Sequence, residues 1–309
     1  MLSGYFSYAV CGLTYPHILE RGSFASSEAL AAAEGIEPYF VIDMPPLFGV
    51  MSALILSFVL GLALAAVRGS AFRSVLNEFR EVIMLVIRKV IIPLLPLYIF
   101  GIFLKMGAEG TVLMVIGLFL KVIIVIFIMH IVLLFLQFCI AGAVAGKNPL
   151  VCLKNMLPAY MTALGTQSSA ATIPVTLAQA KKNGVRAEVA DFVIPLCGTI
   201  HLSGSTLKIV ACAFAIAFMT GMPTDPGLYS EFIFMLGIAM VAAPGVPGGA
   251  IMASIGIIGS ILGFNEDMQG LMIALYIAMD SFGTACNVTG DGAIALIVDR
   301  IFRKSALRR

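Results

Sequence analysis

Residues 280–300 read DSFGTACNVTGDGAIALIVDR, an apolar stretch near the C-terminus that nevertheless contains three aspartates. Four of its polar residues recur at helical spacing, so on a helix they lie within about 60° of one another. They are Asp280, Thr284, Asn287 and Asp291. Ionisable groups inside a membrane-spanning helix are costly and usually functional. We therefore expect this stripe to face the interior of the protein.

The chemistry of the stripe leaves several ligands open. Carboxylate, amide and hydroxyl oxygens are the ligands that hard cations prefer. The same groups could hold an ammonium group or a proton. The alternative without a ligand is a polar seam that joins one helix to the next.

The composition of the whole chain indicates that a bilayer is its solvent. Of the 309 residues, 60% are hydrophobic and 12% are charged, and the mean hydropathy is +1.04. Soluble domains carry about 25% charged residues. The net charge of +2 gives no sign of a nucleic-acid partner, and the six cysteines include no CxxC pair. We predict an all-α polytopic membrane protein in contact with lipid, whose cysteines are small buried hydrophobes.

The apolar stretches divide into continuous and broken ones. A spanning helix needs about 20 mainly apolar residues. The continuous candidates are Met44 to Val67, Val82 to Met106, Val112 to Val144, Val189 to Phe218 and Leu271 to Ile301. Two others, about 150–180 and 232–262, are interrupted by GTQSS (165–169) and PGVPGG (244–249).

Backbone freed at such breaks must be buried in protein or line a cavity. Paired breaks of this kind are typical of the binding site of a transporter. We predict two re-entrant helical hairpins, at about 150–180 and 232–262, with two kinked spanning helices as the alternative.

The charges favour the hairpins. Basic residues fall in the connections at 68–80, 147–154 and 181–186 and close the chain at 300–309, whereas the other connections are acidic or neutral. If both hairpins return to the side from which they came, all basic connections lie on one face. The positive-inside rule makes that face cytoplasmic. We predict a multi-pass protein of the cell membrane (plasma or inner) with a cytoplasmic C-terminus.

The first 43 residues contain one apolar stretch, Tyr5 to Leu13. This stretch is too short to span a bilayer, and the region lacks the basic segment of a signal peptide. We interpret residues 1–43 as the remnant of a lost helix followed by an extracellular loop.

A second polar stripe lies in the stretch Val189 to Phe218. Its members, again at helical spacing, are His201, Ser205 and Lys208. The preceding PLCGT (195–199) should loosen the helix and release backbone carbonyls. A lysine at this depth must pair with a carboxylate, for which Asp280 and Asp291 are available, or lose its proton. The alternative is that it extends to the outer membrane surface.

The two hairpin tips differ in chemistry. The first, TQSSAAT (166–172), offers hydroxyls and backbone N–H groups at a helix N-terminus, which suits a carboxylate. The second, GVPG (245–248), has little side-chain chemistry and reads as a lid with a set backbone shape.

Four motifs in this order carry a resemblance to a known family. They are TQSSAATIPVT (166–176), IPLCGTIHLSGS (194–205), APGVPGGA (243–250) and DSFGTACNVTGDGAIALIVDR (280–300). With them the chain resembles the dicarboxylate/amino acid:cation symporter family, which includes the glutamate transporters, from about residue 40 onward. Members are longer at the N-terminus, where three spanning helices are missing or mostly missing here.

The resemblance implies a homotrimer in which a static scaffold holds a moving transport domain. By position, residues 44–110 would form the scaffold and oligomerisation helices. Residues 111–309 would form the transport domain, with the last helix at 271–303. This domain would carry the solute across the membrane as an elevator, and the second hairpin would be the extracellular gate.

The resemblance also implies roles for individual residues. The substrate-binding set would be Ser168, Ser169, Ser205, Val246, Gly248, Asp280, Thr284 and Asn287. The set for a coupling cation would be Cys197, Thr199, His201, Asn287 and Asp291. The coupling ion would be sodium or a proton, with no other metal and no cofactor.

Several positions depart from the family pattern. Gly283 stands where acidic-substrate members carry an arginine, and Gln167 stands where many carry an arginine or serine. A sodium-binding aspartate is replaced by Ser203 and its neighbouring asparagine by His201, while Ala243 replaces a threonine ligand. At least part of the sodium-binding apparatus is therefore absent.

Lys208 replaces an aromatic residue that is common in the family. Our hypothesis is that its fixed ammonium group takes the place of a bound cation. Coupling would then run through protons, with His201 as the titrating group. The alternative is that Lys208 supplies the missing positive charge for an anionic solute.

These observations predict cation-coupled symport of an amino acid or small carboxylate. A transport-dead or partner-dependent fragment of such a symporter is the alternative. An intramembrane hydrolase built on Ser168 or Ser169 with His201 and Asp280 would lack a Gly-x-Ser-x-Gly elbow, so we do not expect an enzyme. A channel is disfavoured because broken hairpins with an inward carboxylate stripe suggest occlusion.

Overall fold

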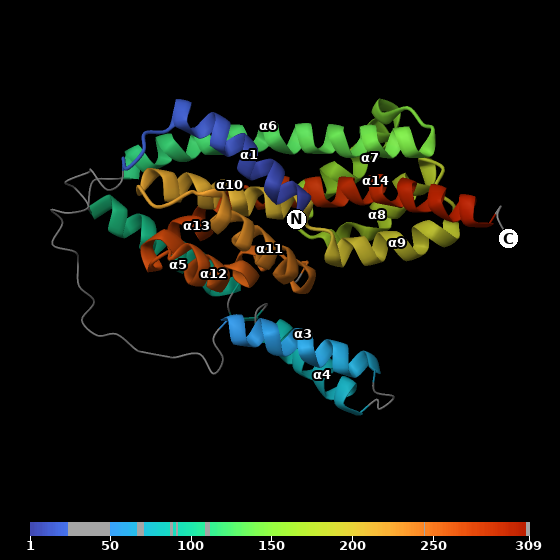
Figure 1. The fold of residues 1–309 in the computed structure, drawn as a ribbon, viewed down its shortest axis with the longest axis horizontal. Coiled ribbons are helices and arrows are strands. Elements are labelled where there is room, and N and C mark those ends of the chain that lie inside the picture. The colour runs from blue at the N-terminus through green and yellow to red at the C-terminus, as the bar shows by residue number, and fades with distance from the viewer. Residues whose placement is uncertain are drawn as a thin grey trace.

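A computed structural model describes residues 1–23, 50–66, 71–86, 89–90, 92–108, 112–243 and 245–306. Within these residues the secondary structure is helical and contains no strands (Figure 1). The first helices along the chain are α1 (Leu2–Ile18), α3 (Val50–Ala66), α4 (Ala71–Val86), α5 (Ile92–Ala108) and α6 (Val112–Ala145). The prediction of an all-α polytopic membrane protein is confirmed.

The remaining helices come in pairs separated by short breaks. The first hairpin is α7 (Pro149–Thr166) with α8 (Ser169–Lys182), and the second is α11 (Pro226–Ala242) with α12 (Gly249–Leu262). Between and after them lie α9 (Ala187–Ile200), α10 (Ser203–Met219), α13 (Glu266–Ala278) and α14 (Asp280–Ala306). The pair α13 and α14 is bent by 61° at its break. The two interrupted stretches therefore form helical hairpins.

Within the described residues, two helical stretches are long and apolar enough to cross a bilayer, and the second contains the break between α9 and α10. They are Ile116–Ala145 and Ala187–Met219, which contain 30 and 33 residues. The bent pair of α13 and α14 passes the same test when its two helices are taken together.

The expectation of one continuous span at Val82 to Met106 falls partly on residues 87, 88 and 91, which lie outside the described residues, so it stays a prediction. Within this stretch the structure describes the end of α4 at Val86 and the start of α5 at Ile92. Pro93 lies in the first turn of α5, a position where its missing N–H is tolerated. Of the stretch Met44 to Val67, residues 50–66 form α3, and the others lie outside the described residues.

The hairpin tips are shaped by residues with positive φ. At the first tip α7 ends at Thr166, and its C-cap residue Gln167 has a φ of 50°, which places a non-glycine residue in the left-handed region. The Ser168 hydroxyl then caps α8. At the second tip, Gly248 has a φ of 72° and precedes α12. A side chain at Gly248 would strain the backbone, so glycine is required here.

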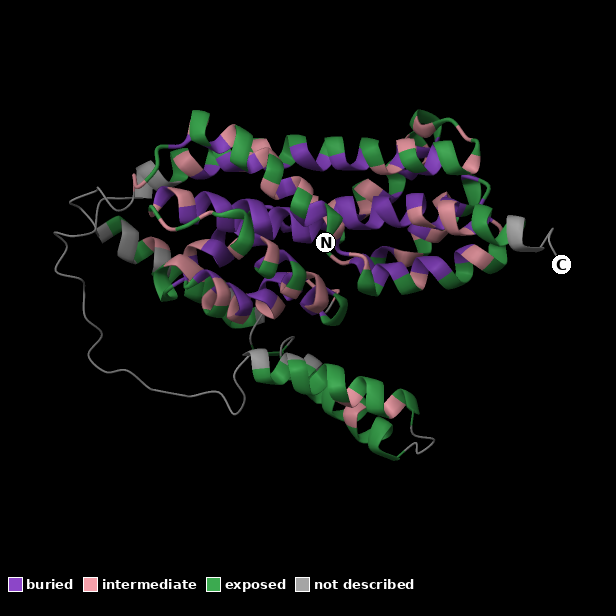
Figure 2. Cartoon of the chain, viewed as in Figure 1, coloured by how far each residue is buried: buried purple, intermediate pink, exposed green. Residues whose placement is uncertain are grey.

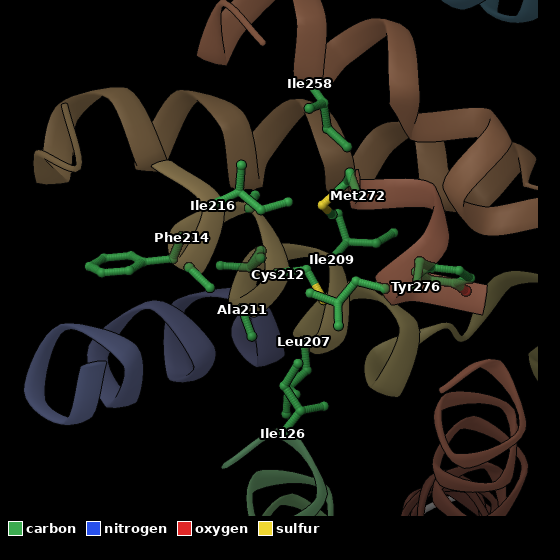
Figure 3. Close-up of a cluster of buried hydrophobic side chains, with 14 of the residues drawn as sticks. Ile126, Leu207, Ile209, Ala211, Cys212, Phe214, Ile216, Ile258, Met272 and Tyr276 are labelled. Carbon is green, nitrogen blue, oxygen red and sulfur yellow. The ribbon is translucent and has the colours of Figure 1, made fainter. Parts of the chain in front are cut away.

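The core is centred on α10, which lies among α1, α6, α13 and α14 (Figures 1 and 2). Leu207, Ile209 and Ile216 of α10 are fully buried. They pack against apolar side chains of the surrounding helices, as Figure 3 shows for Ile126 of α6 and Met272 of α13. An element buried on every side can hold polar groups only where they are paired.

The N-terminal helix α1 packs against α10 and is longer than the apolar stretch Tyr5 to Leu13. Its polar Ser7 faces inward, where the hydroxyl donates a hydrogen bond of 2.8 Å to the carbonyl of Leu207. Residues 24–43 lie outside the described residues.

By contrast, α3 and α4 lie beside the main body with most of their described side chains exposed (Figures 1 and 2). Among the exposed side chains are those of Ile55, Phe58 and Leu62. A run of exposed apolar side chains of this kind suits a lipid or protein neighbour.

Basic residues of the connections at 147–154 and 181–186 lie close to those near the C-terminus. Lys147, before the first hairpin, donates a hydrogen bond to the carbonyl of Asn183, after that hairpin. Arg186 and Arg303 both pair with Asp299, at 2.7 and 2.8 Å. The first hairpin thus returns to the end from which it started, as the charge pattern predicts.

Candidate functional site

The two predicted polar stripes face one another across α10 and α14. Three contacts join them in order, and we call this set the polar ladder. Lys208 Nζ lies 3.2 Å from Asp280 Oδ1. The Asn287 amide donates to Ser205 Oγ at 2.9 Å. His201 Nδ1 lies 2.8 Å from Asp291 Oδ1.

The ladder depends on a break in the helix that carries the second stripe. We expected PLCGT (195–199) to loosen this helix, but α9 continues through Pro195 and ends at Ile200. His201 is the C-cap residue of α9, so it does not share a helix with Ser205 and Lys208. The expectation of one continuous stripe is therefore wrong. A two-residue break at 201–202 separates His201 from α10, so its side chain is oriented independently of Ser205 and Lys208.

Asn287 stabilises this break. Its side-chain oxygen accepts hydrogen bonds from the backbone N–H groups of Gly204 and Ser205, at 2.7 and 3.2 Å. The first N–H groups of any helix lack partners within the helix. An amide contributed by α14 therefore caps the N-terminus of α10 deep inside the protein.

Close packing holds the two helices at this distance. A Cβ atom on Gly204 would lie 2.6 Å from the Gly283 carbonyl oxygen and 2.7 Å from the Cys286 Cβ atom. No other residue fits at Gly204 without moving one helix away from the other.

Lys208 is fully buried and pairs with Asp280, so it does not extend to the membrane surface. Its ammonium group also donates to the Tyr276 carbonyl at 3.2 Å and lies 3.3 Å from the centroid of the Tyr276 ring. An ammonium group at this depth needs an anion and further hydrogen-bond acceptors. Asp280 and Tyr276 provide both.

Both hairpin tips reach this end of the ladder. The backbone N–H of Gly248, at the second tip, donates to Asp280 Oδ2 at 2.7 Å. The Ser168 hydroxyl, at the first tip, donates to the Gly245 carbonyl of the second at 2.9 Å. The tips thus touch each other, and one of them touches the carboxylate that Lys208 holds.

The other residues predicted from the sequence are placed as follows. Ser169 and Thr284 are buried, and Val246 is partly exposed at the second tip. Cys197 is buried in α9. Thr199 is exposed and donates to the Leu196 carbonyl, so the structure does not bring its hydroxyl to the ladder.

The geometry argues against a hydrolase. The Ser168 hydroxyl bonds a backbone carbonyl, His201 faces Asp291, and Asp280 faces Lys208. A nucleophile needs a base within hydrogen-bond reach. The described contacts of these residues contain no such pair.

Sequence reasoning missed two polar residues of α6. His130 Nε2 lies 3.0 Å from the Gly204 carbonyl, and the Gln137 amide donates to Ser203 Oγ at 3.3 Å. They are polar residues seven positions apart in a long apolar helix, so the stripe argument applied to the last helix could have found them. Nδ1 of His130 and Oε1 of Gln137 are buried without a hydrogen-bond partner.

An all-helical membrane protein with paired broken helices, hairpin tips in contact and a buried polar ladder has the architecture of a secondary transporter. Comparison with known proteins gives the same result, because residues 1–301 match the model of the Sodium:dicarboxylate symporter family. The chain belongs to this family.

Curated relatives include the excitatory amino acid transporters. The chain is 32% identical over 162 residues to excitatory amino acid transporter 5 of Mus musculus, covering 52% of this chain and 29% of the relative. It is 30% identical over 248 residues to excitatory amino acid transporter 1 of Rattus norvegicus, covering 78% and 45%. The chain thus spans less than half the length of these relatives.

Proposed function

We propose that the chain is a secondary active carrier of the cell membrane, and not an enzyme, that couples a cation to the movement of a small carboxylate or amino acid. The observation that carries the proposal is the buried Lys208–Asp280 pair. The second hairpin tip contacts this pair through Gly248, and the first tip contacts the second through Ser168 and Gly245. The name of the family and the names of the relatives support the same solute classes.

In this proposal the solute binds where the hairpin tips meet α10 and α14. Ser168 and Ser169, at the start of α8, would hold the solute carboxylate with hydroxyl and backbone N–H groups. The backbone of Val246 and Gly248 at the second tip would form part of the gate. On the opposite side, the solute would contact three residues of the polar ladder helices, Ser205, Thr284 and Asn287. The tips must separate to admit the solute, because the Ser168–Gly245 hydrogen bond closes them.

We also propose a division of the chain into a scaffold and a moving transport domain. Residues 44–110 would be the scaffold of a homotrimer, which the exposed apolar side chains of α3 and α4 suit. Residues 111–309 would move as an elevator. The basic end that contains Lys147, Arg186 and Arg303 would be cytoplasmic, and the C-terminus with it.

A specific observation favours a proton over sodium as the coupling ion. Asp291, the expected sodium ligand, has Oδ1 already in contact with His201 Nδ1 at 2.8 Å. A sodium ion would have to displace the imidazole from this oxygen, whereas a proton can be shared by the pair.

Uptake into proteoliposomes tests both the function and the ion. We expect the purified chain to accumulate at least one carboxylate or amino acid from a panel when an inward proton gradient is imposed, with choline in place of sodium. Uptake that requires sodium and ignores the pH gradient would contradict proton coupling alone. Binding of a solute without uptake would favour a partner-dependent fragment, and the absence of both would contradict the carrier proposal.

A further inference from the structure

Both oxygens of the Asp280 carboxylate are already bonded within the chain. Oδ1 lies 3.2 Å from Lys208 Nζ, and Oδ2 accepts a 2.7 Å hydrogen bond from the backbone N–H of Gly248. Asp280 is 4% exposed and Lys208 is 0% exposed. The carboxylate therefore has an internal ammonium partner and an internal amide partner at once.

The space beside this pair is shaped for the lysine. A Cβ atom on Gly283 would lie 3.1 Å from Lys208 Nζ and 3.3 Å from its Cε atom. Any side chain at Gly283 would press on the end of the lysine. The glycine on α14 thus leaves room for the ammonium group of α10 to lie against Asp280.

Two other acceptors of the ladder also have partners within the chain. The Asn287 oxygen accepts from Gly204 and Ser205, and Oδ1 of Asp291 faces His201. A solute ammonium group would have to separate Lys208 from Asp280 and leave a buried lysine without its anion, which is strongly unfavourable. A solute without an amino group leaves the pair intact.

We propose that Lys208 is a tethered ammonium group that stands in for the amino group of a solute at Asp280, and that the solute is a small carboxylate without an amino group. This inference rests on the proposed function, because it presumes that a solute binds beside the hairpin tips. It makes Lys208 the residue that determines specificity between amino acids and their deaminated analogues.

Matched pairs of solutes test the inference. Binding of succinate against L-aspartate, and of propionate against L-alanine, is measured on the purified chain by thermal shift and calorimetry. We expect wild type to bind the member without an amino group at least about tenfold more tightly in whichever pair it accepts, a ratio that corresponds to about 1.4 kcal/mol.

Lys208→Met is expected to reverse this preference, because it removes the ammonium group at similar length and leaves Asp280 to accept the amino group of the solute. The double variant Lys208→Met/Asp280→Asn should lose the new preference for the amino acid, since the free carboxylate is gone. Lys121→Met is the matched control: this lysine of α6 is exposed and donates to the Ile18 carbonyl, so its loss should leave the preference unchanged.

The inference is overturned if wild type binds the amino acids as tightly as their analogues, or if Lys208→Met folds and keeps the wild-type ratio. Should Lys208→Met fail to fold, the wild-type ratio alone decides. If no solute of either kind binds the wild-type chain, the proposed function fails and this inference fails with it. Uptake of amino acids in preference to their analogues without an amino group would contradict the inference but not the proposed carrier function.

Discussion

Asp280→Asn is expected to lower the free energy of unfolding by about 3–5 kcal/mol, because it removes the anion from a buried pair and leaves the charge of Lys208 uncompensated. Chemical unfolding in detergent micelles measures the change. The same variant should show no uptake in proteoliposomes, since Asp280 also anchors the second hairpin tip through Gly248.

Two controls distinguish the loss of the Lys208–Asp280 pair from the effect of an Asp→Asn change by itself. Lys208→Met/Asp280→Asn should recover most of the lost stability, because neither charge is then buried alone. Asp225→Asn makes the same chemical change at the exposed N-cap of α11, where asparagine caps equally well, and should cost little. If Asp280→Asn is as stable as wild type, the claim that the Lys208–Asp280 pair stabilises the fold is contradicted.

Asn287→Ala is expected to cost about 2–4 kcal/mol and to abolish uptake. The variant leaves the buried N–H groups of Gly204 and Ser205 without their acceptor, and each unsatisfied group costs about 1–3 kcal/mol. It also frees the start of α10, so Ser205 and Lys208 lose their fixed positions on the ladder. The same unfolding and uptake assays measure both effects.

The matched control for this variant is Asn148→Ala. Asn148 caps α7 through the backbone N–H groups of Leu150 and Val151, but these bonds are exposed to solvent. Water can replace an exposed cap, so the cost should be near 1 kcal/mol and uptake should persist. Equal costs for the two variants would contradict a special role for the buried cap.

Much of the site was predictable because its signals are local. Polar residues at helical spacing in an apolar stretch must face inward, and this places Asp280, Asn287 and Asp291 correctly. Both hairpins were predictable from the breaks in two apolar stretches, because backbone freed at a break must be buried in protein.

The partners on the ladder were not predictable, because they depend on how α10 and α14 cross. The sequence left Lys208 with two possible aspartates, and only the packing at Gly204 and Gly283 assigns it to Asp280. The break at 201–202 was misplaced for a related reason. It is fixed by Asn287, which lies more than 80 residues away along the chain, and not by the local proline.

A motif carries residue types but not the direction of a side chain near a helix end, so the hydrogen bond from Thr199 to the Leu196 carbonyl was not predictable, and the role of Thr199 in cation binding remains a prediction. The scaffold and transport domains remain predictions.

The most direct test of the proposed solute site is a reversible cross-link between the hairpin tips. Ser168 and Gly245 are in contact, and a Cβ atom at Gly245 would have room, with its nearest neighbour at 3.6 Å. Uptake is measured for Ser168→Cys/Gly245→Cys in proteoliposomes after oxidation and again after reduction, with each single cysteine variant as a control. Because Ser168 is itself placed at the solute site, the reference is the uptake of the reduced double variant. If the solute enters between the tips, oxidation abolishes this uptake in the double variant only, and reduction restores it. Unchanged uptake by the cross-linked chain would contradict the proposed site.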